Sequence, residues 1–406
     1  MSGRRPRILF AWELGANYGH VTKVALAAEQ LADEAEIFVA LRDPVAFRDI
    51  APDLAATVLP APHARTRQQT PDNRPPANFA AMLTTEGWHA TDALAAQVEA
   101  WRGVIGLVRP DLLVVQAAPT AALAARTLSL RFAVLGSGYD NPPLADPMPA
   151  FDAAAPIDLV RSQEARVVAT ANAVLERFGA PSVARFRDIL EGEASILTTW
   201  EVTDHYVARG RLHPDHPPYL GHLPGLDRGA PRDWRGRPGP RIFAYLRPGT
   251  PPAAAGLAAL MQMGPEADVV LAAPGISDSD RSRLAQRGVQ VEAGPVQLAR
   301  LLSDCDLGIS HASNGVGASF LTAGVPQIGL PGHREQGMFA RAIAHHGLGL
   351  GVEGRYGGDA VVRSIRQALG SERLKNRVGT VAAQLSDRAG VPPQVAVART
   401  LRALVF

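Results

Sequence analysis

Short apolar runs alternate with amphipathic stretches along the whole chain. Near the start, an apolar run over residues 7–12 precedes a glycine-containing turn at 15–20. Residues 21–31 then repeat apolar side chains at helical spacing, and 35–41 form a second apolar run. This order of strand, glycine turn, helix and strand predicts the start of a doubly wound α/β domain.

The same alternation continues through the first half of the chain. Further strands are predicted at 111–116, 131–135 and 196–199, and helical patterns cover 80–108 and 159–178. Polar or proline-rich stretches at 60–78 and 141–156 predict long loops between these elements.

A stretch rich in proline and glycine, 210–240, is predicted to be a linker between two lobes. Beyond it, strands are predicted at 241–246, 267–272, 289–292, 307–310 and 327–330, and helices at 253–263, 297–303, 315–322 and 394–405. Two α/β lobes are therefore expected, residues 1–209 and 241–390. Open α/β sheets bind ligands at the carboxyl ends of their strands, so both lobes should present loops to a central cleft.

Composition narrows the functional classes. The 406 residues carry a net charge of +2, which argues against a dedicated nucleic-acid binder. Cys305 is the only cysteine, so an intrachain disulfide or a thiolate metal cluster is excluded. Uncharged apolar runs of 18 residues are absent, and the first residues lack the apolar stretch of a secretory signal. A soluble, cytoplasmic protein is expected.

The glycine turn carries the first candidate chemistry. Gly15 and Gly19 are four residues apart, which differs from the dinucleotide-binding fingerprint. His20 follows at the start of the predicted helix, where the helix dipole disfavours imidazolium, so a neutral general base is one interpretation. The other is a structural histidine bonded to a turn carbonyl. Glu13, before the turn, is interpreted as a carboxylate that orients His20 or binds an acceptor hydroxyl. The alternative is a solvated carboxylate at the end of the strand.

A second constellation lies at 309–318, where a strand ends near His311 and small residues lead into a helix. Backbone N–H groups at such a helix start bind phosphate. A Gly-Val-Pro turn follows at 324–326, and Glu335 and Gln336 open a later helix. A carboxylate beside an amide can hold vicinal hydroxyls of a sugar; the alternative is a pair that interacts only with the helix dipole.

This order of motifs resembles the glycosyltransferases of the GT-B fold. It is most similar to the UDP-glycosyltransferase superfamily, which includes bacterial antibiotic and macrolide glycosyltransferases and the peptidoglycan N-acetylglucosamine transferase. The resemblance covers nearly the whole chain, and the C-terminal motif is its specific part. It implies an α/β fold of two Rossmann-like, doubly wound lobes facing a central cleft, with a C-terminal helix within 391–406 that crosses back to the first lobe.

The resemblance also implies roles for the candidate residues. His20 would deprotonate the acceptor, and Glu335 and Gln336 would bind the transferred sugar. Val296 lies in the loop whose backbone contacts the nucleobase. The residues expected around the donor phosphates are Arg247, Gly249, Thr250, His311, Ser313, Asn314, Gly315 and Val316. The alternative interpretation of Arg247 is that it is a solvated arginine of a loop without a role in binding.

Four positions depart from the family pattern. Ser313 replaces the second glycine of a pair, and Val316 replaces a phosphate-binding Thr or Ser. Ser319 stands where many UDP-sugar enzymes have a ribose-binding Glu, which leaves a dTDP-sugar as plausible a donor as a UDP-sugar. Gln116 stands near the position of the acidic partner that plant-type members supply to the histidine. Its amide cannot ionise, so another group, with Glu13 as the candidate, is expected to orient His20.

The expected activity is an inverting, metal-independent glycosyl transfer to a hydroxyl of a small-molecule or lipid acceptor, with no cofactor beyond the nucleotide-sugar co-substrate. The triplet from Asp278 to Asp280 matches the D-x-D pattern of a metal-bridging motif, but a helix cap is the preferred interpretation. Alternatives are a nucleotide-sugar epimerase or phosphorylase on the same fold and a catalytically silent nucleotide-sugar-binding homologue. A dehydrogenase finds no support in the second lobe. The acceptor, expected at loops 60–78 and 141–156, is not identified by the sequence.

Overall fold

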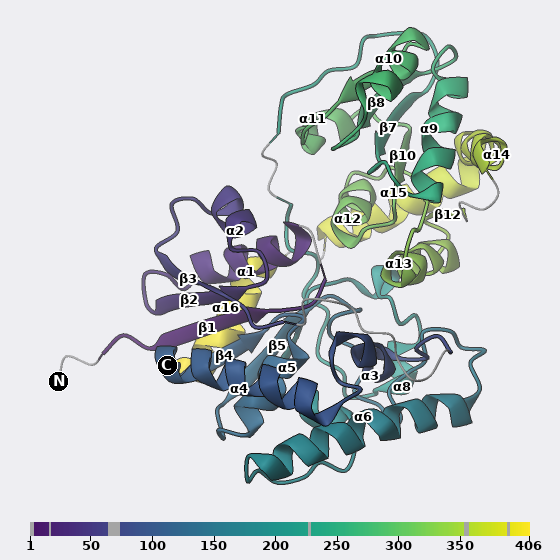
Figure 1. Cartoon of the computed structure of the whole chain (residues 1–406). Helices are drawn as coiled ribbons and strands as arrows, with labels where there is room; N and C mark the ends of the chain where they lie inside the picture. Colours follow the sequence, from purple (N-terminus) through teal and green to yellow (C-terminus); the bar gives the residue numbers. More distant parts are fainter. Residues whose placement is uncertain (1–3, 16–17, 64–73, 226–228, 353–356, 388–389) are drawn as a thin grey trace. The chain divides into compact units, whose positions relative to one another are not determined.

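The computed structural model describes residues 4–15, 18–63, 74–225, 229–352, 357–387 and 390–406 (Figure 1). The chain forms two compact units. The first comprises Met1–Trp200, Ala208–Leu223 and Val391–Phe406, and the second comprises Glu201–Val207 and Pro224–Gly390. The division differs from the boundaries expected from the sequence, because residues 201–207 belong to the second unit and the proline-rich stretch is shared between both.

The first unit is built on a six-stranded parallel sheet with the strand order β3-β2-β1-β4-β5-β6. Its strands are β1 (Arg7–Trp12), β2 (Glu36–Leu41), β3 (Ala56–Pro60), β4 (Leu112–Val115), β5 (Phe132–Gly136) and β6 (Ala194–Leu197). In register, Ile8 of β1 pairs with Ile37 on one side and Leu112 on the other. The winding reverses between β1 and β4, so their carboxyl ends form the topological switch point at which such sheets bind ligands.

Helices cover both faces of this sheet. The helices of the first unit are α1 (Tyr18–Glu29), α2 (Pro44–Ile50), α3 (Phe79–Met82), α4 (Thr91–Val108), α5 (Pro119–Arg126), α6 (Ile157–Arg177), α7 (Arg187–Leu190), α8 (Arg209–Leu212) and α16 (Pro393–Val405), with a 3-10 turn at Leu83–Glu86.

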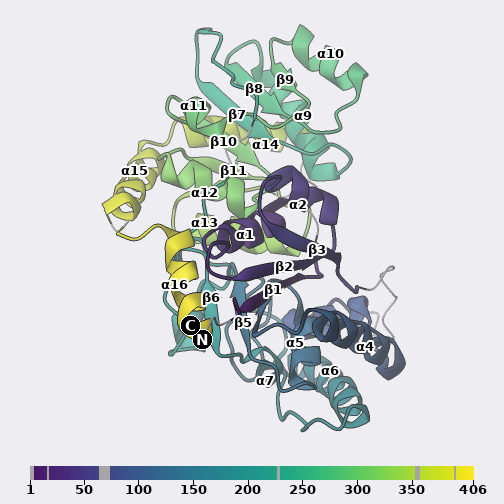
Figure 2. The ribbon, with the colours of Figure 1, turned by 90° about the vertical axis from the view of Figure 1, so that its left-hand side faces the viewer.

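Helix α16 lies beside α1 and β6 although it is distant from both in sequence (Figures 1 and 2). Val397 and Leu401 join the same buried cluster as Val24 of α1. Arg402 forms an ion pair of 2.8 Å with Glu34, at the surface of this contact. The last described helix is therefore part of the core of the first unit.

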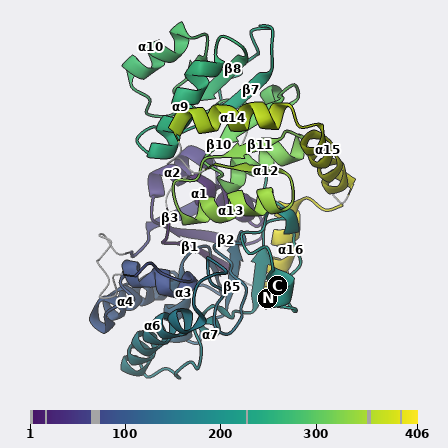
Figure 3. The same cartoon turned by 90° about the vertical axis from the view of Figure 1, so that its right-hand side faces the viewer.

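The second unit repeats the same topology, with the strand order β9-β8-β7-β10-β11-β12. Its strands are β7 (Arg241–Tyr245), β8 (Asp268–Ala272), β9 (Gln290–Glu292), β10 (Leu307–Ser310), β11 (Gln327–Gly329) and β12 (Gly349–Gly351). Its helices are α9 (Pro251–Met263), α10 (Asp278–Gln286), α11 (Leu298–Leu302), α12 (Asn314–Thr322), α13 (Arg334–His345), α14 (Gly357–Leu369) and α15 (Glu372–Asp387), with a 3-10 turn at Glu201–Thr203. Helix α14 packs along α9 (Figure 3). The prediction of two doubly wound α/β lobes is confirmed.

Two further features concern a predicted helix cap and the predicted lack of a membrane span. Asp278 and Asp280 lie in the first turn of α10, but the capping residue is Ser277, whose Oγ accepts from the Asp280 N–H at 3.1 Å and donates to Asp280 Oδ2 at 2.9 Å. Among the described helices, none combines the length and the apolar character that a membrane crossing requires.

Candidate functional site

His20 lies in the first turn of α1, directly after the turn that leaves β1. Its ring stacks on Trp12, with the ring centroids 5.4 Å apart and an interplanar angle of 18°. Gly15 has φ of +85°, and a Cβ at that position would lie 2.5 Å from His20 Nε2. The imidazole is thus held between an indole and a turn that only glycine fits. Ala16 and Asn17, the middle of the turn, lie outside the described residues.

A chain of hydrogen bonds starts at the other ring nitrogen of His20. Nδ1 lies 3.1 Å from Gln116 Oε1, and Gln116 Nε2 donates to Asp140 Oδ2 at 2.7 Å. The same carboxylate oxygen accepts from Lys23 Nζ at 2.8 Å, and Oδ1 accepts from Ser137 Oγ at 2.8 Å. Gln116 follows β4 and Asp140 follows β5, so the chain runs along the carboxyl edge of the sheet at the switch point.

Asp140 and Lys23 were not predicted to belong to the site. Lys23 lies three residues after His20 on α1, which places both on one face of the helix. Asp140 lies in a loop whose course past β4 the sequence does not define. A carboxylate shortly after a predicted strand was the one signal that could have pointed to Asp140.

The electrostatics of the chain keep His20 neutral. Burial lowers the pKa of His20 to about 4, against the opposing attraction of the Asp140 carboxylate. Burial acts against the ionised form of Asp140, but Lys23, His20 and the donated hydrogen bonds together hold the pKa of that carboxyl well below its usual range. Near neutral pH the pair is therefore a neutral imidazole and an ionised carboxylate.

Glu13 is neither solvated nor bonded to His20. It is 1% exposed, its Oε1 accepts from the Thr120 N–H at 2.6 Å, and its Oε2 accepts from Trp101 Nε1 at 2.7 Å. Thr120 is in the first turn of α5, so the carboxyl group caps that helix. Burial raises the pKa of Glu13 to about 8, although the donors at Thr120 and Trp101 oppose the shift. The position expected for Glu13 beside the imidazole is occupied by Gln116.

In the second unit, the start of α12 lacks a side-chain cap. Ser313 occupies the N-cap position without a capping hydrogen bond, and Ala312 before it has φ of 60°. Asn314, the first helical residue, is 8% exposed, and its Oδ1 is buried with no hydrogen-bond partner among the described residues. Gly315 is exposed, and a Cβ added there would meet no described heavy atom within 4 Å. Uncapped N–H groups beside such open space suit an anion.

Val316 and His311 take structural positions on either side of this helix start. Val316 packs against the buried cluster that contains Phe243 and Phe320, so only its backbone can serve a ligand. His311 is buried, and its Nε2 accepts from the Arg247 N–H at 2.6 Å. Burial lowers the pKa of His311. The neutral ring ties the loop after β10 to the loop after β7, so Nε2 of the residue expected to face the donor diphosphate is already engaged.

The turn after β7 leaves Gly249 accessible to a ligand, whereas the side chain of Thr250 is used within the protein. Gly249 has φ of +97° and open space around it, as a close ligand approach requires. Thr250 caps α9, since its Oγ1 accepts from the Ala253 N–H at 3.3 Å. Arg247 Nε donates to Tyr245 OH at 3.3 Å. The hydroxyl of Thr250 is thus already engaged, whereas Gly249 leaves the backbone accessible.

The loop expected at the nucleobase is anchored through its backbone. Ala230 donates to Pro295 O at 3.0 Å and accepts from the Gln297 N–H at 3.1 Å, on either side of Val296. The side chain of Val296 is buried in the same cluster as Phe243. Any nucleobase contact by Val296 would therefore come from its main chain.

Glu335 and Gln336 lie in the first turn of α13. Gln336 Oε1 accepts from the Gly332 N–H at 2.8 Å, and Glu335 Oε1 lies 4.0 Å from His205 Nε2. His205 is buried, with its ring centroid 5.9 Å from that of Phe339. His205 is not recognisable from the sequence, because its segment is predicted to belong to the first lobe and nothing local links it to α13.

The fold gathers most of the predicted donor residues at one edge of the second sheet. They follow β7, β10 and β11, which are adjacent strands with their carboxyl ends at the same edge. Val296 follows β9, at the far end of the strand order. Within the described residues, no group of three or more His, Cys, Asp and Glu side chains is arranged to hold a metal ion.

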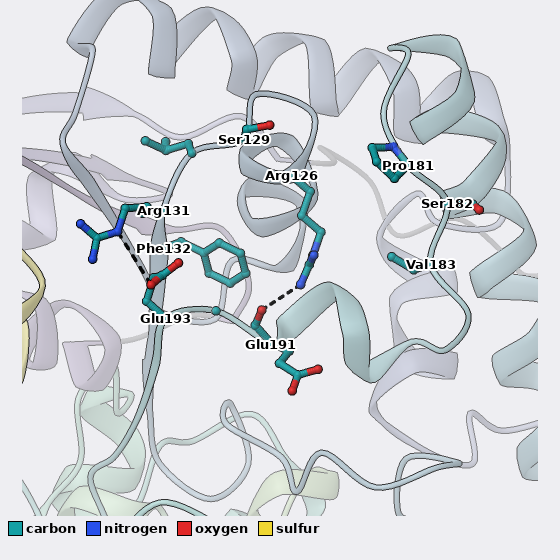
Figure 4. Close-up of a pocket in the computed structure, with 11 residues that line it drawn as sticks. Arg126, Ser129, Arg131, Phe132, Pro181, Ser182, Val183, Glu191 and Glu193 are labelled. Atoms are coloured by element: carbon teal, nitrogen blue, oxygen red, sulfur yellow. Dashed lines mark hydrogen bonds and ion pairs between the residues drawn. The ribbon is translucent and has the colours of Figure 1, made fainter.

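A separate cavity of about 480 Å³ lies at the amino ends of β5 and β6, the edge of the first sheet opposite His20 (Figure 4). Both arginines in its wall have partners within the unit. Arg126 Nη2 donates to Glu191 O at 2.8 Å, and Arg131 lies 3.8 Å from Glu193. None of the predicted site residues lines this cavity, and we assign it no role.

No model of a known protein family matches the sequence, and no curated protein matches it either. Solved structures do match over nearly the whole chain. The glycotransferase of kitacinnamycin has a TM-score of 0.70 at 16% identity, covering 99% of this chain and 100% of that one. CalG4, the calicheamicin glycosyltransferase, has a TM-score of 0.70 at 16% identity, covering 99% and 98%. The spinosyn rhamnosyltransferase SpnG, complexed with thymidine diphosphate, has a TM-score of 0.63 at 16% identity, covering 98% and 100%. The GT-B fold predicted from the sequence is confirmed.

Proposed function

We propose that the protein is a glycosyltransferase that moves a sugar from a nucleotide-diphosphate sugar to a hydroxyl group of a small-molecule or lipid acceptor. The observation that carries the proposal is the state of His20, whose imidazole is neutral and bonded through Nδ1 to Gln116. The fold adds support: among the neighbours, SpnG is described in complexes with thymidine diphosphate and with spinosyn aglycone.

The chemistry follows from the two nitrogens of His20. With Nδ1 engaged, Nε2 accepts the proton of the acceptor hydroxyl. The acceptor oxygen then attacks the anomeric carbon while the bond from that carbon to the diphosphate breaks on the opposite face. The electron pair of the broken bond leaves with the nucleoside diphosphate, and the configuration at the anomeric carbon inverts.

The leaving diphosphate is assigned to the uncapped start of α12. The N–H groups of Asn314 and Gly315 and the helix dipole supply positive potential where the negative charge develops. Arg247 adds a guanidinium on the neighbouring loop, and Glu335 and Gln336 hold hydroxyls of the sugar. With these groups in place we propose transfer without a metal ion, and chelation with EDTA should leave the transfer rate unchanged, whereas a loss restored by Mg²⁺ would contradict it.

The nucleotide is proposed to be a dTDP or UDP species. The position that the family resemblance associates with a ribose 2′-hydroxyl holds Ser319, not a carboxylate, and the Ser319 Oγ donates to Gly315 O at 3.1 Å. The decisive experiment is a thermal-shift panel with dTDP, UDP, GDP, NAD and their sugar conjugates, on the native protein and on Glu335→Ala. A shift with dTDP or UDP species, whose sugar-dependent part is reduced in the variant, supports the proposal. A shift with NAD alone, or with none of the nucleotides, contradicts it.

A catalytically silent nucleotide-sugar-binding protein is the second candidate. Two observations favour it: Val316 offers no hydroxyl to a phosphate, and His311 Nε2 is occupied by the Arg247 N–H. Slow hydrolysis of the bound donor separates the two candidates. The enzyme releases nucleoside diphosphate from its donor and loses this activity on His20→Gln, whereas the silent protein binds the donor and leaves it intact.

A further inference from the structure

Asp140 sits in an environment made of hydrogen-bond donors. Its Oδ2 accepts from Gln116 Nε2 at 2.7 Å and from Lys23 Nζ at 2.8 Å, and its Oδ1 accepts from Ser137 Oγ at 2.8 Å. We infer that Asp140, with Lys23, is a positioning residue that fixes the tautomer of His20 through the amide of Gln116. The consequence for the rate rests on the proposed function; the tautomer itself does not.

The Gln116 amide has a donor group on one side and an acceptor oxygen on the other. An ionised carboxylate only accepts hydrogen bonds, so Gln116 must turn its NH₂ group toward Asp140. Its oxygen then faces His20 Nδ1, at 3.1 Å, and accepts from it. The reverse orientation would place the amide oxygen against a carboxylate oxygen at a hydrogen-bond distance, with no proton between them. The charge on Asp140 thus sets the amide, and the amide places the proton on Nδ1.

Lys23 makes this arrangement stable in a buried setting. Asp140 has a side chain only 5% exposed, and Lys23, 15% exposed, supplies the opposite charge. A buried carboxylate without such a partner would take up a proton, and a protonated Asp140 could donate to the Gln116 oxygen and release the amide. Lys23 therefore keeps Asp140 an acceptor. His20 Nε2 then carries the lone pair that a general base needs.

The tautomer can be observed directly in the ligand-free protein. In ¹⁵N-histidine-labelled protein, long-range ¹H–¹⁵N spectra near pH 7 should show His20, assigned by its loss in His20→Gln, with the proton on Nδ1 alone. Asp140→Asn, whose side chain can both donate and accept, should add the Nε2–H form. The double variant Lys23→Met/Asp140→Asn removes both charges, so that no buried charge is left unpaired, and should show the same mixture. A single Nδ1–H form in both variants would overturn the inference.

The kinetic counterpart uses transfer or donor hydrolysis. Asp140→Asn should lower kcat by about 10²-fold, as expected when a general base populates the wrong tautomer, with the KM for the donor unchanged. Asp92→Asn makes the same chemical change in an exposed ion pair with Arg177 and should retain native kcat. A lowered kcat with an intact Nδ1–H tautomer would contradict the mechanism. If no transfer is found at all, the proposed function fails, and the spectra still decide the tautomer.

Discussion

Gly15 and His20 occupy space that only one side chain can fill. A Cβ on Gly15 would approach His20 Nε2 to 2.5 Å, and Gly15 has φ of +85°, a conformation that favours glycine. The nitrogen proposed to accept the proton therefore faces bare backbone. The same turn shapes both the orientation of the imidazole and the space above it.

Gly15→Ala should consequently damage the reaction more than the fold. The added methyl displaces the imidazole, and kcat for transfer is expected to fall by about 10- to 10²-fold, since small misplacements of a catalytic group have effects of that size. The melting temperature should fall modestly, because a residue other than glycine is destabilised by about 1–2 kcal/mol in this conformation. Gly19→Ala is the matched control: a Cβ there meets no described atom within 4 Å, and activity should be retained. Equal losses in both variants would show that the contact with His20 is not the cause.

The pH dependence of transfer should reflect the low pKa of His20. Because burial lowers this pKa to about 4, the imidazole is unprotonated throughout pH 5–8, and kcat/KM should show no loss from His20 in that range. An unperturbed general base would instead cause the enzyme to lose activity about tenfold for each pH unit below about 6.5.

His20→Gln should reduce kcat by about 10²- to 10⁴-fold with nucleotide affinity unchanged. His345→Gln, at an exposed position, serves as the control. A tenfold decline of native kcat/KM between pH 6.5 and 5.5 that vanishes in His20→Gln would refute the assignment.

Glu13 should contribute to stability in a pH-dependent way. Its folded-state pKa of about 8 exceeds the unfolded value of 4.5, so the folded protein holds a proton that the unfolded chain releases. This contribution is complete below pH 4.5 and is lost as pH rises to 8, at about 1.4 kcal/mol per pH unit. Glu13→Gln does not titrate, and its amide leaves one of the two donors at Thr120 and Trp101 unsatisfied, at a cost of about 1–3 kcal/mol.

Denaturant unfolding of both proteins at several pH values measures this effect. The native protein should be the more stable at pH 5, and the difference should shrink or reverse by pH 8. Subtracting the two curves cancels every other titrating group. A constant difference across this range would mean that Glu13 is ionised in the fold and that its two donors outweigh burial.

The start of α12 should be sensitive to added negative charge. Asn314→Asp places a carboxylate beside the N–H groups assigned to the diphosphate, and repulsion should weaken nucleoside diphosphate binding by tenfold or more, most strongly at low salt. Asn376→Asp changes the net charge equally at an exposed site on α15 and should bind as the native protein does. Titration calorimetry with dTDP and UDP provides the measurement. Unchanged affinity in Asn314→Asp would remove the diphosphate from this helix.

The central strands were predictable because they carry their own signal. Buried parallel strands such as β4 and β5 are continuous apolar runs, and the switch from strand to helical spacing marks each unit. Two edge strands were missed for physical reasons. Strand β3 has no fully buried residue and ends in a proline, Pro60, and β12 has two glycines among its three residues. Neither composition favours a strand without the neighbour that pairs with it.

The candidate site was predictable only where its residues are close in sequence. His20 and the residues opening α12 lie in strand-to-helix turns, whose chemistry is local. The partners of these residues come from distant segments: Asp140 lies 117 residues from Lys23, and His205 reaches Glu335 from a segment before the proline-rich stretch. Glu13 was misjudged for the same reason, since its burial depends on Trp101 and Thr120. Tertiary contacts of this kind leave no periodic trace in the sequence.

The position of α16 has a consequence for the order of folding. The first unit takes Val397 and Leu401 into its core, although the ribosome makes most of that unit long before it makes this helix. During synthesis the face of α1 and β6 that α16 covers stays exposed until the second unit has been translated. A nascent chain that has been made up to the second unit but not yet to α16 therefore exposes an apolar surface, which is the type of surface that chaperones bind. The second unit lies in the sequence before α16, so all its strands have been made when α16 emerges.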